Sequence, residues 1–171
     1  MNASILPLYA FCALLFLGAL QDVFTLRISN FVSAGTFLAA LLFVLLNMSV
    51  GDWWQHILSF VLTLAVGTWL FTRGLLGGGD VKLLAAAALW FDLWQLLTFI
   101  LGVALVGAGV TMAAVTIRLL ATATEETSLR ALRRTSVPYG VAIAAAAIWL
   151  AATSYASPTA IPTIEAEVRS D

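Results

Sequence analysis

The chain has 171 residues, of which 62% are hydrophobic and only 10% are charged, and its formal net charge is −1. Its mean hydropathy of +1.03 exceeds that of soluble domains, in which about half of the residues are apolar. The few scattered basic residues exclude a nucleic-acid-binding surface. The apolar residues form long runs rather than the alternating pattern of a membrane barrel, so the composition predicts an all-α, polytopic membrane helix bundle.

Six apolar runs predict six transmembrane helices in one domain over residues 1–156. They extend over residues 3–20, 31–46, 57–72, 81–91, 93–117 and 138–155. No basic residue precedes the first run, so we expect a retained helix and not a cleaved signal peptide. Residues 157–171 are expected to form a periplasmic C-terminal tail.

The basic residues indicate the orientation, because loops rich in lysine and arginine stay in the cytoplasm. Seven of them lie in or beside the first, third and fifth connections: Arg27, Arg73, Lys82, Arg118, Arg130, Arg133 and Arg134. We therefore expect the N-terminus outside, and residues 124–134 as a topology anchor at the membrane surface. An outer aromatic belt is expected from Trp53, Trp54, Trp90 and Trp94.

Four aspartates lie between the first and fifth runs. Asp52 and Asp92 neighbour tryptophans in the outer connections, where we expect solvated carboxylates without a special role. Asp22 ends the first helix and Asp80 begins the fourth, and an even number of membrane crossings separates them. Asp22 and Asp80 can therefore meet on the cytoplasmic side, whereas neither can meet Asp52 or Asp92.

The fourth run is short, which predicts a buried position for Asp80. From Asp80 to Trp90 the helix would measure about 16 Å, about half of a roughly 30 Å hydrocarbon core. If Trp90 marks the outer interface, the segment from Arg73 to Gly79 dips inward, which irregular backbone does only where protein or a water-filled cavity covers it. An ionisable residue at such a depth usually marks a functional site.

Three glycines precede this aspartate in the stretch GLLGGGDVKLL, residues 74–84. Gly77, Gly78 and Gly79 allow positive backbone angles and the close approach of another segment. A plain tight turn would explain the glycines equally well.

Two carboxyl groups within a few ångströms share a proton, so one acts as a base and the other as an acid. Such a pair can hydrolyse a peptide bond without a metal, a cofactor or a thiol. As a hypothesis, Asp80 is the N-cap of the fourth helix and activates water, while Asp22 at the C-terminal end of the first helix holds the proton. The lone His56 is expected in an outer loop, and the single Cys12 excludes a multi-thiolate metal site.

Three segments together resemble the type IV prepilin peptidases, which are aspartic membrane proteases with a G-x-G-D signature. They are Asp22 followed by RISN at residues 27–30, GGGDVKL at residues 77–83, and VPYGVAIAAAAI at residues 137–148. The resemblance implies Asp22 and Asp80 as the catalytic residues. The residues expected to shape the site are Gly77, Gly78, Gly79, Lys82, Arg27 and Asn30.

Three of these have a second interpretation. Arg27 is explained equally well as a topology anchor, and Asn30 as the N-cap of the second helix. Lys82 is expected to reach the headgroups or the cytosol, because it lies about 200° around the helix from Asp80.

The resemblance also implies an activity, namely removal of a short, positively charged leader from prepilin-like membrane proteins. The cut would fall at the cytoplasmic face of the bacterial inner membrane, just ahead of the apolar helix of the substrate. Larger relatives also methylate the new terminus and carry paired cysteines. The short first connection and single cysteine are similar to the peptidase-only form of tight-adherence (Flp) pilus systems. The sequence leaves the oligomeric state open.

Two alternatives use the same acids. In a small proton-coupled transporter or channel component, Asp22 and Asp80 would relay protons, although acids should then be distributed across the depth of the membrane. A presenilin-like protease would carry a tyrosine before the first aspartate, where this chain has Gln21.

Overall fold

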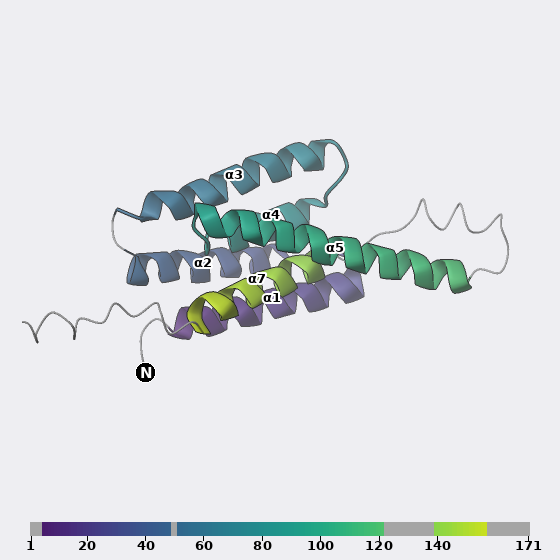
Figure 1. Ribbon diagram of the computed structural model, residues 1–171, viewed down its shortest axis with the longest axis horizontal. Helices are drawn as coiled ribbons and strands as arrows, with labels where there is room; N and C mark the ends of the chain where they lie inside the picture. The colour runs from purple at the N-terminus through teal and green to yellow at the C-terminus, as the bar shows by residue number, and fades with distance from the viewer. Residues whose placement is uncertain (1–4, 49–50, 122–138, 157–171) are drawn as a thin grey trace, which may run out of the picture.

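The computed structural model describes residues 5–48, 51–121 and 139–156, and within these ranges the regular elements are helices. The predicted all-α class is therefore confirmed for the described part of the chain. In chain order the helices are α1 (Ile5–Thr25), α2 (Asn30–Asn47), α3 (Trp53–Thr72), α4 (Gly78–Ala88), α5 (Leu93–Ala121) and α7 (Tyr139–Ala156) (Figure 1). The predicted surface anchor at residues 124–134 and the tail at 157–171 lie outside the described residues.

Four of these helices, α1, α2, α3 and α5, are long and apolar enough to cross a membrane. Helix α7 is apolar but shorter, and α4 has only 11 residues. Multiple membrane crossings are thus well supported, whereas six crossings and the outside position of the N-terminus remain predictions.

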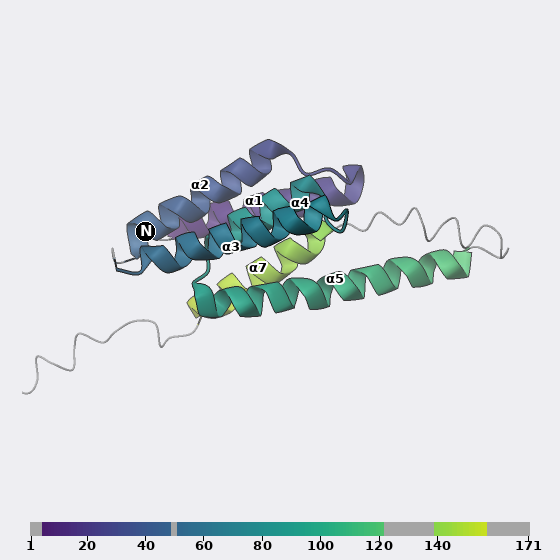
Figure 2. The same ribbon diagram turned by 90° about the horizontal axis from the view of Figure 1, so that it is seen from above.

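Helix α4 lies inside the bundle and contacts α2, α3 and α7, while α1 packs between α2 and α7. Figure 2 shows α5 beside α7 at one side of the bundle, with its C-terminal half extending past the other helices. The second half of α4 is a run of buried alanines, Ala85 to Ala88. Their small side chains let neighbouring helices approach closely, which is how helices associate in membranes. A helix too short to span a bilayer is thus covered by protein.

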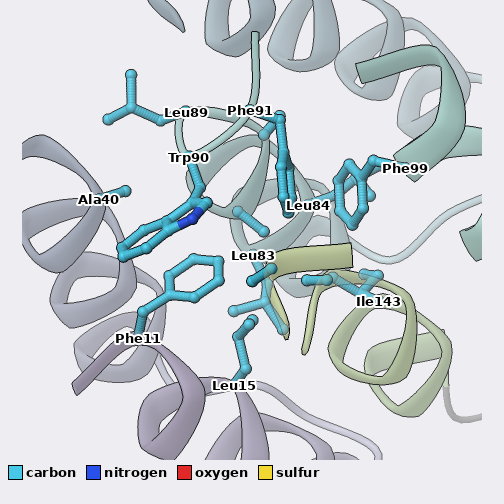
Figure 3. Close-up of a cluster of buried hydrophobic side chains, with 14 of the residues drawn as sticks. Phe11, Leu15, Ala40, Leu83, Leu84, Leu89, Trp90, Phe91, Phe99 and Ile143 are labelled. Atoms are coloured by element: carbon cyan, nitrogen blue, oxygen red, sulfur yellow. The ribbon is translucent and has the colours of Figure 1, made fainter. Parts of the chain in front are cut away.

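Aromatic side chains fill the end of the bundle where α4 finishes (Figure 3). Trp90 is 2% exposed and stacks between Phe11, at a centroid distance of 4.3 Å, and Phe43, at 4.0 Å. Phe91 packs against Phe99 at 5.0 Å. The prediction that Trp90 belongs to an interfacial belt is therefore wrong, because stacking draws it into the core.

Trp90 therefore does not mark the outer membrane interface, and the predicted depth of Asp80 can no longer be measured from it. The belt residues Trp54 and Trp94 are exposed, whereas Trp53 is half-buried and donates its ring N–H to the carbonyl of Met48.

Two residues expected in outer loops have structural roles instead. His56 lies within α3 and is 5% exposed, and its Nδ1 is 3.2 Å from the carbonyl oxygen of Leu89. A carbonyl only accepts, so Nδ1 carries the proton and ties α3 to the end of α4. The Asp92 carboxylate accepts the N–H groups of Trp94 and Gln95 at 2.9 and 2.8 Å, so it caps α5 rather than being simply solvated. Asp52 is exposed, as expected.

Candidate active site

Asp22 lies in the last turn of α1 and is 4% exposed. The helix closes just beyond it: the N–H of Leu26 donates to the backbone carbonyl of Asp22 at 2.9 Å, and Leu26 has a φ of 53°. This left-handed residue reverses the chain, as is common after a helix C-terminus. The reversal directs residues 27–29 back over the end of α1, where the N–H of Ser29 donates to Oε1 of Gln21 at 3.1 Å.

The start of α7 meets the Asp22 side chain. The backbone N–H of Gly140 donates to Oδ2 of Asp22 at 2.6 Å. A Cβ atom on Gly140 would lie only 2.9 Å from that oxygen and 3.1 Å from Cδ1 of Ile28, so the contact requires glycine. Gly140 is a site residue that the sequence did not predict. Its only signal was its place in the segment VPYGVAIAAAAI, because the contact depends on a packing partner 118 positions away in the chain.

Asp80 is the third residue of α4, and its Oδ2 accepts the N–H of Gly77 at 3.3 Å. The prediction that Asp80 is the N-cap is wrong: Gly77 holds that position, because Gly78 and Gly79 are already helical. The carboxylate therefore reaches back to the cap from the N3 position, as in one half of a capping box. It still lies at the start of a helix, where free N–H groups favour negative charge.

The glycines before Asp80 act through close approach rather than through positive backbone angles. Gly77 has a φ of −75°, and the glycine with positive φ in the described chain is Gly74, at 72°. A Cβ on Gly79 would lie 3.3 Å from Cβ of Ile28 and 3.5 Å from its backbone. One on Gly78 would meet the Phe71 ring at 3.4 Å. A Cβ on Gly79 would therefore require Ile28 to shift slightly, whereas one on Gly78 would make ordinary van der Waals contact with the ring.

Ile28 connects the two halves of the site, because it contacts Gly79 of α4 and Gly140 of α7. The carboxyl groups of Asp22 and Asp80, 58 positions apart in the sequence, are close enough to interact electrostatically. The structure therefore brings these two aspartates together at one end of the bundle. Asp52 and Asp92 precede α3 and α5, at the end where α4 finishes.

The hypothesis that Asp22 holds the shared proton loses its basis. It considered only the C-terminal end of α1, which disfavours a negative charge. The start of α7 adds a second helix end of the opposite sign at the same carboxyl group. Helix dipoles therefore do not rank the two aspartates.

Lys82 and Asn30 contact each other and not the acids. The Lys82 ammonium donates to Oδ1 of Asn30 at 2.9 Å, which links α4 to the start of α2. Asn30 is not the N-cap of α2: Ser29 is, and its Oγ accepts the N–H of Phe31 at 3.2 Å. Ser29 takes the N-cap position because the turn after Leu26 leaves it in an extended conformation just before the helix. Arg27 is exposed.

A cavity of about 700 Å³ opens beside Asp80. Asp80, Tyr139 and Thr111 contribute polar groups to its wall. The remaining lining residues are apolar or glycine and come from α3, α4, α5 and α7 or the turn before α4: Leu70, Leu76, Leu84, Ile100, Val103, Ala104, Gly107, Ala108, Met112, Val115 and Ile143. A cavity at Asp80 was expected to be wet, whereas this wall is mainly apolar and suits a hydrophobic ligand.

Among the described residues, no group of three histidine, cysteine or acidic side chains could hold a metal ion. This end of the bundle instead holds the carboxyl groups of Asp22 and Asp80, each of which accepts a hydrogen bond from a backbone N–H at the start of a helix. The molecule is therefore a multi-pass helical membrane protein with an acidic pair beside an apolar cavity.

The type IV leader peptidase family matches residues 9–112, which is more than half of the chain, and the chain belongs to this family. The predicted relationship is confirmed, and the protein is a peptidase of this family. The matched region contains both Asp22 and Asp80, whereas Tyr139 and Gly140 lie beyond it. No curated protein and no solved structure matches the chain.

Proposed function

We propose that this protein is an aspartic endopeptidase that removes the leader from prepilin-like proteins at the cytoplasmic face of the bacterial inner membrane. Membership of the leader peptidase family supports proteolysis. The observation that supports the catalytic type is that Asp22 of α1 and Asp80 of α4 lie near enough for their charges to interact. The short first connection and the single cysteine favour the peptidase-only, tight-adherence form.

In this mechanism the two carboxyl groups share one proton, because two like charges held close together cannot both ionise easily. The ionised aspartate takes a proton from water as the water oxygen bonds to the scissile carbonyl carbon. The protonated aspartate gives its proton to the carbonyl oxygen. As the C–N bond breaks, the aspartate that took the water proton gives it to the departing amine. The other aspartate takes back its proton from the hydroxyl that becomes the new carbonyl oxygen, so the pair returns to its starting state. No covalent link to the enzyme forms.

The apolar cavity beside Asp80 offers a binding site for the apolar part of the substrate. A prepilin-like substrate carries an apolar helix immediately after the bond to be cut, and the wall beside Asp80 is made mainly of Leu, Ile, Val and Ala side chains. The first residues of that helix would fill the cavity and hold the preceding peptide bond against the acids. Positioning of this kind contributes strongly to catalysis.

The remaining residues of the site hold the acids in place. Gly77 donates its N–H to Asp80, and Gly78 and Gly79 leave room for Phe71 and Ile28. The contact between Lys82 and Asn30 fixes the start of α4 to the start of α2, just after the connection that carries Arg27. We assign these residues a positioning role and only Asp22 and Asp80 a chemical one.

The test is co-expression with a prepilin-like protein, with leader removal followed by gel mobility. Asp22→Asn and Asp80→Asn keep the shape of the side chains and remove their proton chemistry, so each should slow processing by about 10²- to 10⁴-fold. Asp52→Asn is the matched control, because Asp52 is an exposed aspartate at the other end of the bundle. Processing that survives both substitutions would reject the proposal. A proton flux lost in both variants, with no processing by the wild type, would favour the transporter.

A further inference from the structure

A second cavity, of about 320 Å³, lies between α2 and α3 on a different face of α4 from Asp80. Figures 1 and 2 both show α2 and α3 diverging from their shared connection toward the end where α2 begins. Phe37, Phe60 and Leu64 form its apolar walls, and Ala85 and Ala86 of α4 form its floor. A neighbouring cavity of about 310 Å³ shares Leu64 and Lys82 with it. We call the two cavities together the α2–α3 groove.

The open end of the groove is positively charged. Lys82 is exposed and lines both cavities. Its hydrogen-bond partner is the neutral side-chain amide of Asn30, so this contact leaves the charge of the ammonium uncompensated. An ammonium group has three N–H donors, of which Asn30 takes one. Lys82 therefore has both the charge and the free donors to bind an anion.

A buried hydroxyl lines the same cavity as this charge. Ser33, on the same helix as Asn30, lines the cavity and is 6% exposed. Among the residues that the structure describes, its Oγ atom has no hydrogen-bond partner. Leaving a buried hydroxyl unbonded is unfavourable, so such a group usually indicates a missing partner. The groove thus combines a cation, a polar donor and an apolar channel in that order.

We propose that the α2–α3 groove binds one anionic phospholipid, with the phosphate at Lys82 and Ser33 and an acyl chain between Phe37, Phe60 and Leu64. A lipid supplies both chemistries at once, and basic side chains at a membrane surface favour anionic headgroups. The leader of the proposed substrate is positively charged, so Lys82 would repel it. The inference concerns binding and does not depend on the proposed peptidase activity.

The charge is tested by native mass spectrometry of the detergent-solubilised protein with phosphatidylglycerol or phosphatidylcholine. The wild type should bind phosphatidylglycerol about fivefold more tightly, the preference that one lysine near a membrane surface typically provides. Lys82→Gln should abolish this preference, and Lys82→Arg should restore it. Equal binding of the two lipids by the wild type, or a preference that persists in Lys82→Gln, would overturn the proposal.

The channel is tested by filling it. Ala34 lines the groove, so Ala34→Phe should weaken the binding of both lipids at least severalfold. Ala65→Phe is the matched control, because Ala65 is exposed on α3 and does not line the groove. Binding unchanged by Ala34→Phe, or weakened equally by Ala65→Phe, would contradict a lipid chain in this channel.

Competition separates the possible occupants. Glycerol 3-phosphate has the anion without the acyl chain, and a synthetic basic leader peptide has the opposite charge. Neither should displace phosphatidylglycerol from the wild type. Displacement by glycerol 3-phosphate would show an anion site that does not require a lipid, and displacement by the peptide would assign the groove to the substrate. Either result would overturn the proposal.

Discussion

The two ends of α4 differ in the side chains that surround them. At its C-terminal end, Trp90 stacks between Phe11 and Phe43, and His56 of α3 bonds to the carbonyl of Leu89. At its N-terminal end, Asp80 lies near enough to Asp22 for their charges to interact, and Ile28 packs close to Gly79 and Gly140. One helix of 11 residues therefore joins a packed aromatic core to an acidic pair.

The difference indicates how a buried charge is tolerated here. An acid within an apolar bundle is costly, and it must be supported by contacts elsewhere. The aromatic end fixes α4 through many van der Waals contacts, which remain effective in a membrane. The acidic end can then be selected for reactivity. We therefore expect substitutions at the aromatic end to reduce stability and those at the acidic end to reduce activity.

The largest effect on stability should come from Trp90→Ala. Removing a fully buried aromatic side chain typically costs about 3–5 kcal/mol, and Trp90 packs against two other rings. Thermal unfolding in detergent measures the loss. Trp94→Ala is the control, because Trp94 is 84% exposed. The protein that remains folded should keep its specific activity. A fall in specific activity with Trp90→Ala would contradict the expectation that the aromatic end affects stability alone.

Gly140→Ala should be the next most damaging change, with a cost of about 1–3 kcal/mol from overpacking. The new Cβ would clash with Asp22 and Ile28, so leader processing should fall more than stability does. Gly109→Ala is a matched control in α5, where a Cβ meets nothing within 4 Å. Equal behaviour of the two variants in the gel assay would remove Gly140 from the site.

His56→Phe tests the polar contact at the aromatic end. It keeps a ring in α3 but leaves the carbonyl of Leu89 without its histidine donor, which should cost about 1 kcal/mol. The midpoint of thermal unfolding should fall, and processing by the folded protein should stay unchanged. A selective loss of processing would instead place His56 in the function of the acidic end.

The smallest effect is expected for the contact between Lys82 and Asn30. A double-mutant cycle with Lys82→Ala and Asn30→Ala should give a coupling of at most about 0.5 kcal/mol in stability, as for other exposed pairs. The coupling measured on the processing rate should be larger, because the contact joins α4 to the start of α2, where the connection that follows Asp22 ends. Additive effects on the rate would show that this contact does not position the acids.

The predictions that proved wrong, those of burial and of helix caps, share one origin. Trp90 and His56 were placed by their neighbours in the sequence, which are polar and turn-forming, and both are buried by helices from elsewhere in the chain. Asp80 and Asn30 were displaced from the predicted cap positions by three and one residues, since glycine and serine begin those helices. Local sequence predicts a helix well, but it fixes the ends of a helix and the burial of its residues poorly.

The sequence by itself determined that this is a helical membrane protein of the leader peptidase family, because long apolar runs and the G-x-G-D segment are local properties of the chain. It also predicted that Asp22 and Asp80 can pair, because two membrane crossings are expected between them. Only the tertiary structure decided which groups contact those acids. Gly140, Ile28 and the apolar cavity come from segments distant in the chain, and their contacts exist only once α1, α4 and α7 have packed together.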